Sequence, residues 1–131
     1  MSVFKAILGI CETKELDSTS WRMDGGRVAV KLEDAPELNR KGGAIYLKGG
    51  ELAKPLLLVR AEDGSMLAFA NRCSHLLGRK VDPVPGESRL RCCSLGHSEY
   101  GYDGQVIKGP AKEPLKKYTV EIDNGDIVVT L

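Results

Sequence analysis

Four cysteines and two histidines are the side chains of this 131-residue chain that could bind a metal ion through sulfur and nitrogen. Only Cys11 lies apart from the rest. The other five lie in one short stretch and are Cys73, His75, Cys92, Cys93 and His97. Cysteines that merely fill a core have no reason to gather with every histidine of the chain. The cluster therefore indicates metal or redox chemistry first and a disulfide framework second.

The spacing within this stretch separates two Cys/His pairs. One residue lies between Cys73 and His75, so both side chains point the same way where the segment is extended. Seventeen residues then separate His75 from Cys93, which is followed by His97. Two loops at neighbouring hairpin tips would bring the two pairs together. Thiolate and imidazole are the ligands of zinc or of an iron–sulfur cluster.

Short β-rich runs separated by turn signals dominate the chain from Arg27 onward. Strands are predicted at 27–32, 44–47, 56–60, 66–71, 89–92, 100–102, 105–108, 117–122 and 127–131. Two prolines and a glycine in 81–87 exclude a central strand there. Asp34 is predicted to cap a short helical turn that begins near Pro36. The pattern is that of an all-β domain with about eight to ten short strands.

The N-terminal residues carry the weakest pattern. Residues 1–26 are predicted to form an extension with one or two helical turns that ends at a Gly-Gly pair. Its Trp21 and Ile10 are expected to pack onto the domain formed by 27–131. The chain is therefore expected to be one domain with an N-terminal extension.

Charge and hydropathy exclude several classes of function. Nineteen basic residues nearly balance 18 acidic residues, so binding to nucleic acid or to a membrane surface is not indicated. No apolar run approaches the roughly 18 residues that span a bilayer. The apolar run at 6–11 is shorter than the ~7–15 residues usual in a signal peptide. A cytoplasmic protein without a membrane span is therefore expected.

The segments around both ligand pairs resemble the Rieske-type 2Fe–2S proteins. The stretch LLLVRAEDGSMLAFANRCSH (56–75) is similar to the strand, turn and strand that lead into the Cys-x-His of that family. CSLGHSEYGYDGQVIKGPA (93–111) resembles the second ligand loop, its hairpin and its proline loop, and PLKKYTVEIDNGDIVV (114–129) resembles the closing hairpin. The resemblance covers 27–131. It implies an antiparallel β-sandwich or barrel with a small cluster-binding subdomain made of loops at about 72–80 and 92–100.

By this resemblance, one iron is bound by the thiolates of Cys73 and Cys93 and the other by two imidazoles, of which His75 supplies one. Where the family has its second histidine this chain has Gly96, and His97 stands where the family has glycine. The predicted ligands are Cys73, His75, Cys93 and His97, with Cys92 as the substitute for His97. Three alternatives stay open: a 2Fe–2S cluster, a fold that has lost its cluster, and a zinc site on the same residues.

Three further residues match positions around the cluster in that family. Ser98 and Tyr100 match hydroxyl groups that donate hydrogen bonds to cluster and ligand sulfur atoms and raise the reduction potential. Pro110 belongs to a loop that packs over the cluster and excludes water. Members from cytochrome bc complexes carry a disulfide between the two ligand loops, but this chain has Gly78 and Leu95 near those positions. It therefore resembles the single-domain, ferredoxin-like type.

The expected function is that of a soluble electron-transfer protein that exchanges one electron with a redox partner such as a reductase or an oxygenase. Both histidines are assigned to the cluster, so none is left for the two-histidine, one-carboxylate iron of a ring-hydroxylating oxygenase. The chain is therefore predicted to be a carrier or an oxidoreductase subunit rather than an enzyme by itself. The alternative is an accessory subunit without a cluster, or with zinc, that resembles the small subunit of some nitrite reductases.

Overall fold

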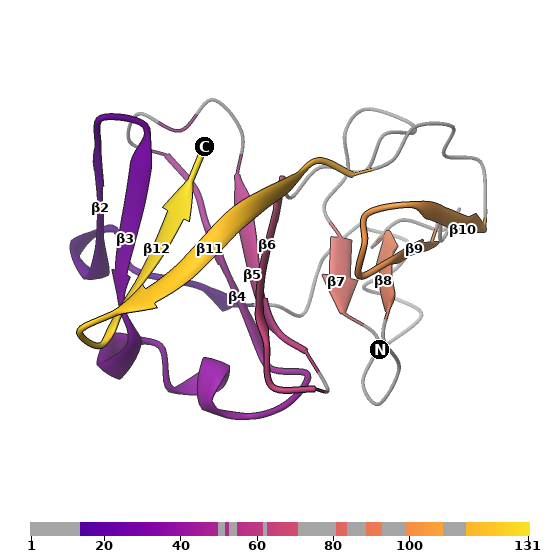
Figure 1. The fold of residues 1–131 in the computed structure, drawn as a ribbon, viewed down its shortest axis with the longest axis horizontal. Coiled ribbons are helices and arrows are strands. Elements are labelled where there is room, and N and C mark those ends of the chain that lie inside the picture. Colours follow the sequence, from indigo (N-terminus) through magenta and orange to yellow (C-terminus); the bar gives the residue numbers. More distant parts are fainter. Residues whose placement is uncertain are drawn as a thin grey trace.

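The computed structural model describes residues 14–49, 52, 55–61, 63–70, 81–83, 89–92, 99–108 and 115–131. These residues form a larger and a smaller β-sheet that lie next to each other (Figure 1). The helical segments among them are single 3-10 turns, and none is long and apolar enough to cross a membrane. The all-β fold predicted from the sequence is confirmed.

The larger sheet contains eight strands and the smaller sheet four. The order of the larger sheet is β1 (Lys14–Glu15), β4 (Ala44–Leu47), β5 (Leu56–Arg60), β6 (Met66–Ala70), β11 (Lys117–Asp123), β12 (Asp126–Thr130), β3 (Arg27–Lys31) and β2 (Trp21–Asp24). The order of the smaller sheet is β10 (Val106–Lys108), β9 (Glu99–Gly101), β8 (Arg89–Cys92) and β7 (Val81–Pro83). Neighbouring strands are antiparallel, except that β1 runs parallel to β4.

Strand β5 contributes to two hydrophobic cores, one on each of its faces. Because successive side chains of a strand point to opposite faces, Leu56 and Leu58 enter one core while Leu57 and Val59 enter the other. The first core lies within the larger sheet and consists of Leu16, Val28, Val30, Ala35, Leu38, Ile45, Leu47, Leu56, Leu58, Ala68, Ile127 and Val129. The second core lies between the two sheets and consists of Leu57, Val59, Phe69, Leu90, Tyr100 and Leu115.

Most of the predicted strands are present. Those expected at 44–47, 56–60 and 89–92 have the same bounds in the structure. The closing hairpin is also confirmed: Asn124 and Gly125 have φ angles of 51° and 82°, as the type I′ turn between β11 and β12 requires. The proline-containing β7 is an edge strand, which agrees with the exclusion of a central strand.

In the described part of the N-terminal segment, residues 14–26, one 3-10 turn is present and the remaining structure is β rather than helical. Its described residues form β1, one 3-10 turn η1 (Ser18–Ser20) and β2, and the two strands lie at opposite edges of the larger sheet. Trp21 and Met23 alternate with exposed Arg22 and Asp24, and both pack against the first core. These two strands help to explain why the described residues hold twelve strands rather than about eight to ten. Ile10 lies outside the described residues.

The prediction that Asp34 caps a helical turn is wrong. Asp34 is the last residue of a preceding 3-10 turn, η2 (Leu32–Asp34). Ala35 then stands before a second turn, η3 (Pro36–Asn39), which has proline at its start as expected. Two consecutive turns therefore replace the single one, because the chain already bends at Leu32.

Candidate metal centre

The predicted ligands and the proline loop lie outside the described residues, in three segments joined to the sheets: the first segment (71–80), the second segment (93–98) and the third segment (109–114). These segments hold Cys73, His75, Cys93, His97, Ser98 and Pro110. The structure describes the strand residues at which each segment begins and ends. The arrangement of these residues can therefore be compared with what a shared site requires.

The first and second segments attach to the same end of the smaller sheet. Val81 directly follows the first segment, and it pairs with Cys92, which directly precedes the second segment. Arg91 in turn pairs with Glu99, the residue at which the second segment ends. Directly paired residues of antiparallel strands have Cα atoms about 4.5–5.5 Å apart. The chain therefore enters or leaves this end of the sheet at three adjacent positions.

The third segment begins at the same end of the sheet. Lys108, the last residue before it, pairs with Glu99 across a register shift between β9 and β10. The residue after the segment, Leu115, is buried in the second core, and its backbone N–H donates to the carbonyl oxygen of Gly104 at 2.7 Å. Gly104 has φ +89°, and a Cβ atom there would stand 2.5 Å from the carbonyl oxygen of Leu115. Only glycine fits this contact.

The start of the first segment lies beside the end of the third. The backbone N–H of Ala70, the last residue of β6, donates to the carbonyl oxygen of Lys116 at 2.9 Å. The next pair along, Phe69 with Lys117, belongs to the larger sheet. Both sheets thus contribute the fixed points between which the three segments run. The predicted meeting of two ligand loops agrees with these strand ends, whereas the ligand positions themselves are outside the described residues.

Two of the predicted site residues belong to the described strands. Cys92 is the last residue of β8, as predicted. Tyr100, predicted to lie near the cluster, is fully buried in the second core among Leu57, Phe69 and Leu90. Its ring therefore helps to hold the smaller sheet against the larger one.

An ion pair between half-exposed Arg89 and buried Glu99 was not found from the sequence. The guanidinium of Arg89 lies 2.9 Å from the carboxylate of Glu99, whose residue is only 6% exposed. Arg91 pairs directly with Glu99 across the two strands. The alternation of charged and apolar residues in RLRC was a usable signal, but the partner of Arg89 depends on the register of β8 with β9.

The metal-binding side chains of the first and second segments fit a 2Fe–2S group. Two thiols and two imidazoles are the donor set of a cluster with two cysteines on one iron and two histidines on the other. In the described part of the chain, no three histidine, cysteine or carboxylate side chains are grouped so that they could hold a metal ion. The predicted set therefore has no competitor among the residues that the structure describes.

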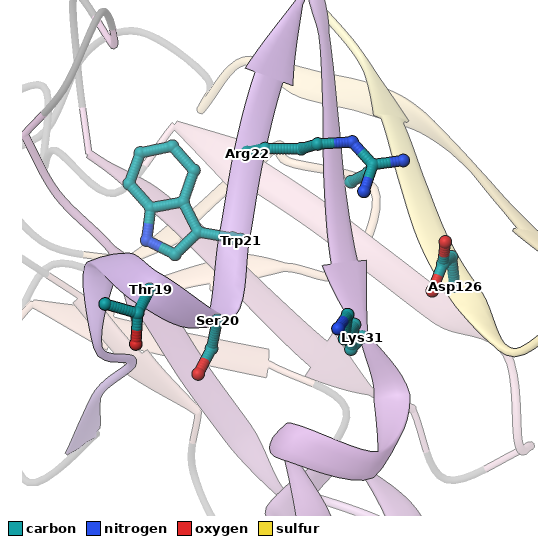
Figure 2. Close-up of a pocket in the computed structure, with 7 residues that line it drawn as sticks. Thr19, Ser20, Trp21, Arg22, Lys31 and Asp126 are labelled. Carbon is teal, nitrogen blue, oxygen red and sulfur yellow. The ribbon is translucent and has the colours of Figure 1, made fainter.

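A pocket of about 190 Å³ lies on the larger sheet, away from the strand ends described above (Figure 2). Residues of β2, β3 and β12 and of the η1 turn line it: Thr19, Ser20, Trp21, Arg22, Ala29, Lys31 and Asp126. Figure 2 shows Trp21 and Arg22 pointing to opposite sides of β2, so the indole and the guanidinium do not face a common ligand.

The resolved pKa shifts also lie outside the smaller sheet. Hydrogen bonds from the backbone and then the hydroxyl of Thr19 lower the pKa of Asp17. The hydroxyl of Ser65, followed by its backbone N–H, lowers the pKa of Asp63. Burial raises the pKa of Tyr118, which lies in β11. These groups belong to turns and to a strand of the larger sheet.

Two curated relatives are subunits of cytochrome complexes. The cytochrome b6-f complex iron-sulfur subunit of Chlorobaculum tepidum is 36% identical over 75 residues, which cover 57% of this chain and 40% of that protein. The chloroplastic cytochrome b6-f complex iron-sulfur subunit of Bigelowiella natans is 35% identical over 95 residues, covering 70% of this chain and 37% of that protein. The chain thus spans less than half the length of either relative.

A solved structure with a similar fold is the cyanobacterial plasma membrane Rieske protein from Synechocystis PCC 6803. It superposes with a TM-score of 0.60 at 25% sequence identity, covering 73% of this chain and 93% of that one. The names of these three proteins contradict the prediction of a cytoplasmic location, because each names a membrane or a complex of cytochromes. The prediction rested on the lack of an apolar run, and that lack says nothing about where a domain of this type works.

The family comparison covers most of the chain. Residues 8–119 match the family described as the Rieske 2Fe-2S domain, so the match includes both Cys/His pairs and the strands that carry them. Its N-terminal limit falls inside the predicted extension. The chain therefore belongs to the Rieske 2Fe-2S domain family.

Proposed function

We propose that this chain carries one electron on a 2Fe–2S cluster to or from an oxidoreductase partner. The family is one of electron-transfer domains, and its relatives are named as iron–sulfur subunits. The observation that carries the proposal is the attachment of all three segments to one end of the smaller sheet, at Val81, Cys92, Glu99 and Lys108. Such an arrangement is what a cluster shared between two loops and covered by a third requires.

In this proposal Cys73 and Cys93 bind one iron, and His75 binds the other with a second donor. The cluster would supply a reversible one-electron change. The protein would contribute donors from two segments that both attach to the segment-bearing end of the smaller sheet, so that the geometry changes little between the two redox states. It would also exclude water on the side of the third segment, where Leu115 and Gly104 fix the returning chain.

His97 is our choice for the second imidazole. It lies one residue later than the family's histidine, and one backbone step moves a side chain by up to about 3.8 Å. Gly96 precedes it and can adopt backbone angles closed to other residues, which permits the loop to turn the imidazole inward. Cys92 is the substitute donor, and it ends β8 next to Val81.

Ser98 and Tyr100 are proposed to donate hydrogen bonds to the sulfur atoms of the cluster and its ligands. Such bonds stabilise the reduced and more negative cluster and so raise its potential. Tyr100 is fully buried in β9 of the smaller sheet, two residues after the end of the second segment, which keeps its side chain out of bulk water. The partner that exchanges the electron is proposed to be a cytochrome or an oxidoreductase component, since the relatives are named for cytochrome complexes.

The test is the electron paramagnetic resonance spectrum of the anaerobically purified and then reduced protein. A cluster with two histidine ligands is expected to give a red-brown oxidised protein and a reduced signal with a low average g value. A spectrum typical of an all-cysteine cluster would contradict the histidine assignment. A colourless protein that gives no signal would contradict electron transfer and favour the accessory subunit without a cluster.

A further inference from the structure

The ion pair of Arg89 with Glu99 lies on one face of the smaller sheet. Glu99 begins β9 at the segment-bearing end, whereas Arg89 begins β8 at the other end, opposite Gly101, and its side chain reaches the Glu99 carboxylate diagonally. Leu90 and Tyr100 pair with each other and enter the second core, so their neighbours in β8 and β9 occupy the opposite face. That face is not an open surface at this point, because Glu99 is only 6% exposed. The carboxylate and the guanidinium are 2.9 Å apart.

Burying a carboxylate costs the free energy of removing its charge from water, and the partner of the carboxylate must offset this cost. Among the described residues Glu99 is the buried charged side chain, while the acidic groups of the larger sheet lie at the surface or are half-buried. A charge taken out of water is retained only when it is paired and hydrogen-bonded. An apolar or neutral residue would serve the packing of this hairpin at lower cost, so the pair calls for a reason beyond stability.

Covalent geometry places this pair close to the proposed cluster. Glu99 follows His97 by two residues, and two residues of extended chain span at most about 7 Å. The guanidinium of Arg89 is held against the same carboxylate. Interactions over this distance are within the screening length of about 8 Å at physiological ionic strength, and the low exposure of Glu99 weakens the screening of its charge further. The Arg89 side chain is 36% exposed, so its charge acts on whatever the second segment binds through more solvent screening than the charge of Glu99.

We propose that Glu99 and Arg89 form a charge pair whose two members shift the reduction potential of the cluster in opposite directions, an inference that rests on the proposed function. The reduced cluster carries one more negative charge than the oxidised cluster. The carboxylate of Glu99 opposes the incoming electron, and the guanidinium of Arg89 favours it. The pair thus holds two opposing effects on the potential in balance, while the ion pair itself anchors the start of β9.

The test is a redox titration of the cluster in the wild type and in charge variants. Glu99→Gln is expected to raise the potential and Arg89→Gln to lower it. The double variant Arg89→Gln/Glu99→Gln should lie between the two and close to the wild type. Arg89→Lys keeps the charge and is expected to shift the potential less than Arg89→Gln, even if the weaker pairing lowers stability.

A matched pair of charges is available on the larger sheet. Lys31 of β3 pairs directly with Asp126 of β12, far from the smaller sheet (Figure 1). Lys31→Gln and Asp126→Asn change the net charge by the same amounts as the two test variants and should leave the potential unchanged. Equal shifts from these controls would show that only net charge matters.

The outcomes separate this inference from the proposed function. Shifts of opposite sign in Glu99→Gln and Arg89→Gln, with little change in the controls, support the charge pair. Shifts of the same sign, or none, overturn it and leave the pair as a structural contact of the β8–β9 hairpin. A wild-type protein that binds no cluster overturns the proposed function and this inference with it.

Discussion

The larger and the smaller sheet differ in how each is stabilised. The larger sheet encloses a core of its own, to which β3, β4, β5, β6 and β12 all contribute. The smaller sheet has no such core in the described part of the chain. Its buried members of the second core, among the described residues, are Leu90 and Tyr100, and Val106 of β10 packs partly buried against them. The other buried members of that core come from β5, β6 and the residue after the third segment. The smaller sheet is therefore stabilised by the face of the larger sheet on which it packs.

This difference explains where the candidate site lies. Four strands of three or four residues are too short to be stable alone, so their ends stay in place only while they pack on the larger sheet. One sheet supplies stability and the other presents loops for chemistry. The predictions below separate these two roles.

The largest effect is expected from the proposed thiolates. Cys73→Ser and Cys93→Ser should each abolish iron binding, because one iron loses half of its protein ligands. The far-ultraviolet circular dichroism of the larger sheet should persist, since the described strands of that sheet enclose a hydrophobic core of their own. Iron content per chain, measured together with circular dichroism, checks this. A Cys73→Ser protein that retains its iron would contradict the assignment.

The same measurement distinguishes the two candidates for the fourth ligand. His97→Ala should alter the spectrum of the cluster and reduce iron binding, while Cys92→Ser should change neither. If Cys92 is the ligand instead, Cys92→Ser should alter the spectrum and reduce iron binding, and His97→Ala should change neither. An unchanged spectrum in both variants would exclude both residues and require another donor.

Variants of two adjacent leucines of β5 test the roles of the two sheets more directly. Leu58→Ala and Leu57→Ala each remove a fully buried side chain and should lower the free energy of unfolding by about 2–5 kcal/mol. Leu57 faces the second core, which the smaller sheet shares, whereas Leu58 faces the first. Leu57→Ala should therefore release iron faster at equal stability. The measurements are urea unfolding and the rate of iron transfer to a chelator.

The outcome for this pair bears on the role of the second core. Equal rates of iron release in the two variants would mean that the packing of the smaller sheet does not control the site. Faster release in Leu58→Ala would mean that the division of roles between the sheets is wrong.

A third, smaller effect compares two glycines with similar backbone angles. Gly104 has φ +89° and Gly125 has φ +82°, but a Cβ atom would meet the backbone of Leu115 only at Gly104. Gly125→Ala should lower the free energy of unfolding by about 1–2 kcal/mol through backbone strain alone. Gly104→Ala adds a clash and should cost roughly 2–4 kcal/mol. Thermal unfolding of both variants gives the comparison, and equal costs would contradict the close contact.

The smallest effect concerns the turn between β5 and β6. The folded-state pKa of Asp63 is lowered because Ser65 donates two hydrogen bonds to its carboxylate, from the hydroxyl and from the backbone. A lowered pKa contributes stability above the unfolded value of about 3.9, and this contribution is lost as the pH falls through the folded value. Asp63→Asn should therefore make stability less dependent on pH below about pH 4. Urea midpoints between pH 2 and pH 6 check this, and a steeper dependence in the variant would contradict it.

The sequence predicted the central strands of the larger sheet better than its edge strands. The central strand LLLVR is a continuous apolar run between turn signals, which is typical of a strand buried on both faces. The edge strand WRMD was missed, although Trp21 and Met23 alternate with polar residues and a Gly-Gly turn follows. The parallel pairing of β1 with β4 could not be predicted, because no local signal specifies a partner some thirty residues away.

The candidate site was predicted from residue types, their spacing and a resemblance to the Rieske-type proteins. Strand ends at Val81 and Cys92 agree with two loops that meet, which the spacing of the Cys/His pairs had indicated. The pair of Arg89 with Glu99 could not be predicted, since it depends on the register of two strands joined by the second segment. The location was predicted wrongly because hydropathy reports only spans, not the complexes in which related domains are found.

The most direct test of the central claim is the iron and acid-labile sulfide content of the anaerobically purified protein. The claim is that three segments at one end of the smaller sheet hold a 2Fe–2S cluster. It predicts two irons and two sulfides per chain. A protein with neither iron nor sulfide, or with one zinc ion in their place, would contradict it.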